Sequence, residues 1–166
     1  MEEKKLFNKD FTLVVIGQII SLLGNAIIRL ALPLYLLDIT GSSTVYGGAL
    51  ACSMIPYVIL SPIGGVVADR VNKRNIMVLL DFSTAAVLVL FCLGLKVFNP
   101  VVLVTVVMML LYSIYAMYQP SVQASIPLLQ SQENLLRANS MINLVNAVST
   151  LAGPVIGGMC YGALGI

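Results

Sequence analysis

The chain alternates between long apolar stretches and short polar connections. Each stretch runs for ~20 residues or more, which is the length that an α-helix needs to cross the ~30 Å hydrocarbon layer of a membrane. A membrane β-strand needs only ~10 residues and shows strict apolar–polar alternation, which these stretches lack. The pattern predicts an all-α integral membrane protein with about five transmembrane helices, over residues 11–36, 45–68, 76–95, 100–121 and 139–162.

Composition supports this fold class and excludes others. Hydrophobic residues make up 59% of the chain and charged residues 10%, whereas an ordinary soluble domain carries about 25% charged residues. A formal net charge of +2 gives no basic surface for nucleic acid, so nucleic acid is not an expected partner. We expect a cytoplasmic tail over residues 1–10, followed by a single transmembrane domain over residues 11–166, with its fourth connection at residues 127–133.

The placement of Lys and Arg predicts the orientation in the membrane. Short cytoplasmic loops of membrane proteins carry an excess of these residues. Lys96 is the one basic residue in the connections predicted to lie outside, whereas seven lie on the other side: Lys4, Lys5, Lys9, Arg70, Lys73, Arg74 and Arg137. The expected protein is a multi-pass component of the cell (plasma) membrane, with a cytoplasmic N-terminus and membrane lipid as its surroundings.

The sequence offers little for catalysis or for metal binding. Cys52, Cys92 and Cys160 each lie inside an apolar run without metal-ligand spacing, so we expect small buried hydrophobic residues and no disulfide. The chain has no His, and it lacks the Gly-Lys-Ser/Thr loop that binds nucleotide phosphates. We therefore expect no enzyme activity, no metal and no cofactor.

Polar residues nevertheless recur inside three of the predicted spans. At ~100° per residue, those of the first and fourth spans each fall within an arc of about 80°, and those of the fifth also share one face. Two interpretations stand: hydrogen bonding between packed helices, or a shared water-accessible pathway for a substrate. The residues are Gln18, Ser21, Asn25 and Arg29 on the first span, Thr105, Tyr112, Tyr115, Gln119 and Gln123 on the fourth, and Asn139, Asn143, Asn146, Thr150, Gly153 and Gly157 on the fifth.

Two charged residues inside the spans each have two interpretations. Arg29 either extends toward the outer interface or contacts an anionic or polar group of a substrate or of another part of the protein. Asp81 either pairs with Arg70 or Arg74 near the cytoplasmic end or takes up and releases a proton.

The strongest motif follows the second span, at residues 64–74. It resembles the signature loop of the major facilitator superfamily, with a Gly four residues before an Asp and basic residues after it. The matching residues are Gly65, Asp69, Arg70, Lys73 and Arg74. The resemblance implies a cytoplasmic gating loop. Independently of the family, we expect Gly65 to permit close helix approach. Asn72 replaces the usual Gly, and we expect it to be tolerated because Asn adopts left-handed backbone geometry.

A second element, on the fifth span, narrows the resemblance. Gly153, Pro154, Gly157 and Gly158 are similar to an element of family members that exchange substrate for protons. Residues 118–127 resemble the macrolide-type drug efflux branch. The chain departs from many proton-coupled exporters of the family because no Arg lies between Lys96 and Arg137, in the fourth span.

The resemblance implies a function for a larger assembly. It covers about five helices of the N-terminal six-helix bundle of a twelve-helix fold, so a missing C-terminal half or a second chain is an expected partner. It implies secondary active transport, with proton-coupled efflux of a small amphipathic, drug-like compound. The alternative is a truncated or accessory membrane protein without autonomous transport activity.

Overall fold

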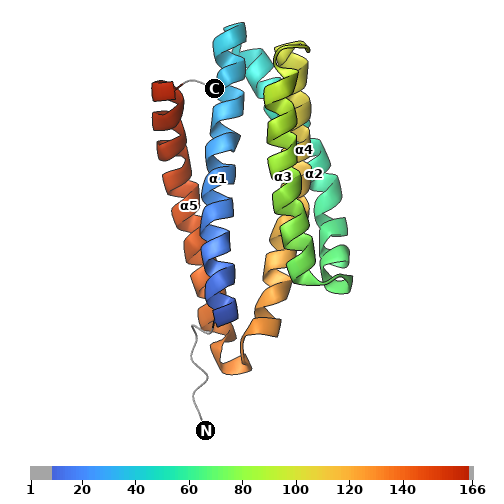
Figure 1. Cartoon of the computed structure of the whole chain (residues 1–166), viewed down its shortest axis with the longest axis vertical. Coiled ribbons are helices and arrows are strands. Elements are labelled where there is room, and N and C mark those ends of the chain that lie inside the picture. Colours follow the sequence, from blue (N-terminus) through green and yellow to red (C-terminus); the bar gives the residue numbers. More distant parts are fainter. Residues whose placement is uncertain (1–8, 165–166) are drawn as a thin grey trace. The chain divides into compact units, whose positions relative to one another are not determined.

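The computed structural model describes residues 9–164, and these residues are almost entirely helical, with no strand among them (Figure 1). Five long α-helices follow one another, with one short 3-10 helix, η1, before the last. Their bounds are α1 (Lys9–Thr40), α2 (Ser43–Arg70), α3 (Lys73–Gly94), α4 (Pro100–Leu129), η1 (Gln132–Asn134) and α5 (Leu135–Leu164). All five α-helices are long and apolar enough to cross a membrane, so the predicted fold class is confirmed.

Most of the helices are longer than a hydrocarbon layer requires. α1 has 32 residues and α4 has 30, and at ~1.5 Å per residue each extends well past ~30 Å. α4 continues through Pro127 to Leu129, so the connection expected from residue 127 begins later than predicted. A proline so close to a helix end removes only one backbone hydrogen bond, which the helix tolerates. Most of the basic tail predicted over residues 1–10 lies outside the described residues.

The described residues belong to two compact units, which are considered separately. The first contains the chain up to Ala31 together with the chain from Gln123 onward, and the second contains residues 32–122. α1 and α4 therefore each contribute to both units.

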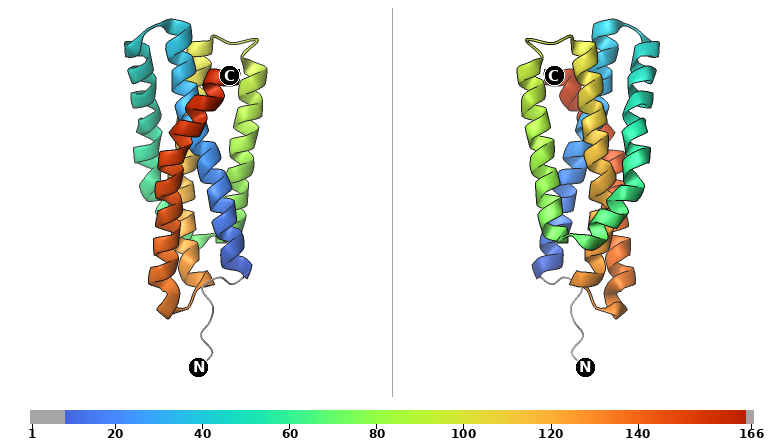
Figure 2. Two further views of the ribbon diagram at one scale, coloured as in Figure 1. Left: turned by 90° about the vertical axis from the view of Figure 1, so that its left-hand side faces the viewer. Right: turned by 90° about the vertical axis from the view of Figure 1, so that its right-hand side faces the viewer.

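In the first unit, α5 lies beside the N-terminal part of α1 (Figures 1 and 2). Small residues make this approach possible. A Cβ atom added at Gly153 would overlap the Cβ of Ala26, and one added at Gly157 would lie 3.2 Å from the Cα of Ile27. Without a strong hydrophobic drive between helices in lipid, such close backbone approach supplies the packing.

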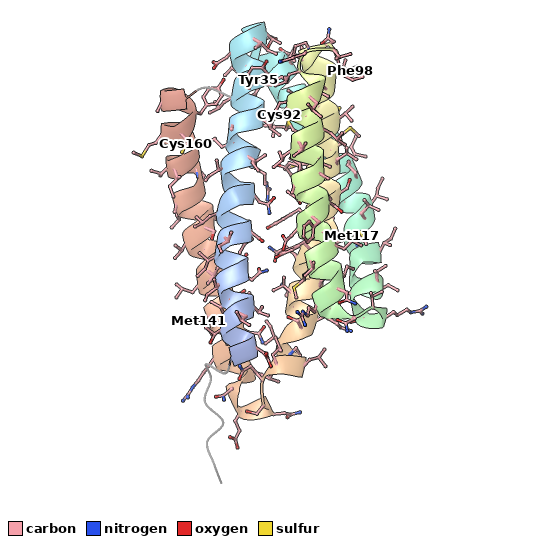
Figure 3. The ribbon with its side chains drawn as sticks, in the orientation of Figure 1. Tyr35, Cys92, Phe98, Met117, Met141 and Cys160 are labelled. Carbon is pink, nitrogen blue, oxygen red and sulfur yellow. The ribbon has the colours of Figure 1, made fainter. Side chains whose placement is uncertain are left out.

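In the second unit, α2 crosses α4 at a glycine (Figure 2). A Cβ added at Gly64 would lie 2.8 Å from the carbonyl oxygen of Ala116 and 3.0 Å from the Cα of Met117, which Figure 3 labels. A Cβ added at Gly65 would meet nothing within 4 Å. Within the second unit the close approach to α4 is therefore made at Gly64, because Gly65 points ~100° away, and the role expected for Gly65 stays a prediction.

The three cysteines are free, as predicted, but they are exposed rather than buried. Cys160 points outward from α5 (Figure 3). The expectation of burial was wrong because an apolar run in a membrane protein is compatible with a lipid-facing surface as well as with a core.

The two adjacent glycines of α2 give a matched test of the α2–α4 contact. Gly64→Ala should destabilise the fold by about 1–3 kcal/mol, because the added methyl group meets backbone atoms that cannot rotate away. Gly65→Ala should be neutral or stabilising by up to ~1 kcal/mol, because it removes backbone freedom from a helix without a clash. Thermal unfolding of the purified protein in detergent measures both. Equal melting temperatures for the two variants would contradict the contact.

Candidate functional site

The predicted gating loop is a tight connection between α2 and α3. α2 ends at Arg70 and α3 begins at Lys73. The Nζ of Lys73 donates a hydrogen bond to the backbone carbonyl of Asp69 at 2.9 Å. This bond helps to close the end of α2 and does not occupy the Asp69 carboxylate. Asp69, Arg70 and Arg74 are all exposed, so their charges face outward from the described residues.

Asn72 is accommodated in this loop in a different way from the one predicted. Its φ of −63° lies outside the left-handed region, and its side chain caps α3. The Oδ1 accepts hydrogen bonds from the backbone amides of Arg74 at 3.1 Å and Asn75 at 3.4 Å. Asn is among the best N-cap residues because its side chain satisfies amides that have no partner within the helix. Asn72, which replaces the usual Gly of the motif, therefore serves as the N-cap of α3.

In the first unit, the predicted pathway residues differ in burial. Gln18 is only 1% exposed, whereas Asn25 and Arg29 are half-buried. On α5, Asn143 is exposed and Asn146 is half-buried. α1 and α5 thus present both buried and accessible polar side chains.

In the second unit, Tyr112, Tyr115 and Gln119 do come together on α4. The Nε2 of Gln119 donates a hydrogen bond to the Tyr115 hydroxyl at 3.1 Å. A residue that the polar pattern did not reveal joins them from α2: the ring of Tyr57 lies 6.1 Å from that of Tyr115 and 6.4 Å from that of Tyr112, between centroids. Tyr57 is isolated in an apolar run, so no stripe pointed to it. Its spacing of seven residues from Gly64 places it on the α4-facing side of α2.

Several polar side chains inside the helices bond to their own backbone. The amide of Asn25 donates to the carbonyl of Ser21 at 2.8 Å, and the hydroxyls of Thr105 and Thr150 donate to the carbonyls four residues earlier, each at 2.8 Å. These groups need no partner on a neighbouring helix. Their recurrence on one face therefore does not by itself demand either helix–helix hydrogen bonds or a wet pathway, and both interpretations stay predictions.

The predicted exporter-type element divides into two kinds of position. Gly153 and Gly157 are buried against α1, where they allow the close approach described above. Pro154 is exposed and Gly158 is half-buried. The two glycines that are four residues apart therefore make the contact, as the helical repeat requires.

Asp81 is the last of the predicted site residues, and it lies on α3. Asp81 is exposed on α3, and the roles considered for it, pairing or proton transfer, stay predictions. Within residues 9–164, no group of three or more His, Cys, Asp or Glu side chains could hold a metal ion.

Comparison with known proteins assigns the sequence pattern to a family. The family model described as Major Facilitator Superfamily matches residues 14–166. Macrolide efflux protein A of Streptococcus pyogenes is 28% identical over 162 residues, which cover 97% of this chain and 40% of that protein. Enterobactin exporter EntS of Escherichia coli is 23% identical over 164 residues, covering 94% of this chain and 38% of that protein. The chain thus spans about 40% of the length of these relatives. No solved structure matches it.

The Asn72 cap is testable with two substitutions. Asn72→Ala should lower the free energy of unfolding by about 1 kcal/mol, because the amides of Arg74 and Asn75 lose their acceptor. Asn72→Asp should retain stability, since a carboxylate also caps and also favours a helix N-terminus. Denaturant or thermal unfolding in detergent measures the difference. A stable Asn72→Ala protein would show that the cap contributes nothing.

Proposed function

Because the chain belongs to the major facilitator superfamily, we propose that it forms part of a secondary active transporter that exports a small amphipathic compound in exchange for protons. The observation that carries this proposal is the family match over residues 14–166, together with two relatives that are named as an efflux protein and an exporter. Five long apolar helices support it, since such a chain resides in a membrane.

The proposed pathway uses polar side chains that an ordinary lipid-facing helix would not carry. In the first unit these are Gln18, Asn25, Arg29, Asn143 and Asn146, and in the second they are Tyr112, Tyr115 and Gln119. Polar groups inside a bilayer are costly and commonly mark a substrate route. We assign them the task of contacting the substrate along such a route.

The proposed gate is the connection between α2 and α3. It is short, and side-chain hydrogen bonds hold both helix ends: Lys73 bonds to the Asp69 carbonyl at the end of α2, and Asn72 caps the start of α3. Its exposed charges, Asp69, Arg70 and Arg74, are placed to form and break contacts with another part of the transporter. Such contacts stabilise one state of a two-state cycle and bias its population.

A second candidate function is compatible with the hydrogen bonding of the polar side chains. The chain spans about 40% of its named relatives, and substrate sites of such transporters lie at the interface between two repeats. An accessory or truncated membrane protein without transport activity of its own is the alternative, and it is supported by polar side chains that bond to their own helix backbone.

Dye efflux in cells separates these functions. Bacteria that lack their own dye exporters are loaded with ethidium, and its loss is followed with and without a proton-gradient uncoupler. They express the chain alone or with any further spans encoded in frame after codon 166. We expect faster dye loss than in cells carrying an empty vector, and we expect the uncoupler to abolish the difference.

Two other results would change the proposal. Efflux that persists with the uncoupler would contradict proton coupling but would still support a transport function. Absence of any efflux due to the expressed protein, with normal insertion in the membrane, would contradict transport and favour the accessory function.

A further inference from the structure

Tyr57, Tyr112 and Tyr115 form a cluster in the second unit. The ring of Tyr57 contacts the other two rings, and helix packing alone does not explain why Tyr57 is a tyrosine. The rings of Tyr57 and Tyr115 stack with an interplanar angle of 24°, and those of Tyr57 and Tyr112 meet edge to face at 89°. Aromatic pairs of this kind add about 0.5–1.5 kcal/mol beyond their buried area. Phenylalanine would provide the same ring contacts, so the hydroxyl of Tyr57 calls for a separate explanation.

The hydroxyl of Tyr57 lies at an unfavourable depth. Tyr57 is at the middle of the predicted second span, residues 45–68, where neither membrane interface supplies hydrogen-bond partners. Among residues 9–164, no group forms a hydrogen bond with this hydroxyl. A hydroxyl left unbonded in hydrocarbon costs free energy, which a water molecule or a ligand group can recover.

Two members of the cluster are partly accessible. Tyr112 is only 7% exposed, whereas Tyr57 and Tyr115 are half-buried. The ring of Tyr115 is oriented by the bond from the Gln119 amide. Part of the Tyr57 ring and its hydroxyl are therefore accessible next to Tyr115, whose ring is held by its hydrogen bond with Gln119.

Two prolines interrupt the backbone hydrogen bonding of α2 around Tyr57. Pro56 and Pro62 lie in α2 on either side of it, so the carbonyls of Cys52 and Val58 lack their usual helical donors. Helices bend at such positions. A bend would change how much of the Tyr57 ring is covered by α4.

We propose that Tyr57 is a substrate-contact residue that selects flat, ring-bearing compounds with a hydrogen-bonding group. A flat ring would lie against its exposed π-face, and a polar group on the ligand would bond to its hydroxyl. Tyr57, Tyr112, Tyr115 and Gln119 include no charged group, so recognition rests on ring contact and neutral hydrogen bonds. The inference depends on the proposed export function for its biological meaning, but binding is measurable without transport.

Binding is tested with single-tryptophan variants, because the chain has no Trp of its own. Tyr57→Trp is compared with Tyr46→Trp, at a half-buried tyrosine of the same helix that has no ring contact within residues 9–164. The purified protein in lipid nanodiscs is titrated with the flat dye rhodamine 6G and with erythromycin, a large non-planar ring. We expect saturable quenching by rhodamine 6G at position 57 only, and weaker binding of erythromycin.

The role of Tyr57 in selection is tested with substitutions that separate the ring from the hydroxyl. Tyr57→Leu should weaken rhodamine 6G binding by about 3- to 10-fold relative to Tyr46→Leu, because a ring contact is lost. Tyr57→Phe should retain most of the ring contact and lose only the part due to the hydroxyl. Binding to these variants is followed by rhodamine polarisation.

The outcomes distinguish this inference from a packing role and from the proposed function. If Tyr57→Leu lowers the melting temperature but leaves rhodamine 6G binding unchanged, Tyr57 only holds α2 against α4 and the inference is overturned. If quenching is equal at positions 46 and 57, the dye merely partitions into lipid, and the inference is again overturned. Site-specific binding in a protein without efflux would uphold the inference and contradict only the export function.

Discussion

The hydrocarbon interior of a membrane offers no hydrogen bonds, and this constraint governs the structure. Every backbone amide and carbonyl within it must find a partner in the chain, which is why the described residues form long helices. The same constraint acts on side chains. Asn25, Thr105 and Thr150 bond to their own helix. A polar group without such a partner, like the Tyr57 hydroxyl, therefore becomes informative.

Packing within each unit then depends on how closely backbones approach. In the first unit Gly153 and Gly157 allow α1 to approach α5 closely, and in the second unit Gly64 allows α4 to approach α2 closely. Lipid competes with apolar side chains for contact, so bulky residues gain little by turning inward. Small residues at the crossings allow backbone contacts that lipid cannot replace. The remaining surface is apolar, as the exposed Cys160 and Phe82 illustrate.

The sequence was sufficient for the fold class and the family, because both rest on strong signals: span length for the helices and the residue 64–74 motif for the superfamily. It was insufficient for details that depend on which face of a helix meets a neighbour. Adjacent Gly64 and Gly65 look alike in the sequence, yet only Gly64 contacts α4. Likewise, a motif comparison could not reveal that Asn72 acts through its side chain, because the pattern records the residue and not its hydrogen bonds.

The candidate site was only partly predictable for a related reason. Tyr115 and Gln119 share a face by helical spacing, and their hydrogen bond follows from that spacing. The approach of Tyr57 from another helix depends on the crossing of α2 and α4, which no periodicity within one span describes. The stripes of α1 and α5 remain a predicted pathway, since side chains that bond to their own helix are compatible with packing and with water.

The most direct measurement of that pathway is the water accessibility of neighbouring positions in the middle of α5. Thr150 belongs to the polar stripe and adjacent Leu151 does not, and both are exposed. With Cys52, Cys92 and Cys160 replaced by Ala, Thr150→Cys and Leu151→Cys are treated in intact membranes with a charged, water-soluble maleimide. The reagent reacts with thiolate in water, so a pathway predicts labelling of position 150 roughly tenfold or more faster than position 151. Equally slow labelling at both positions would contradict a water-accessible transport route along α5.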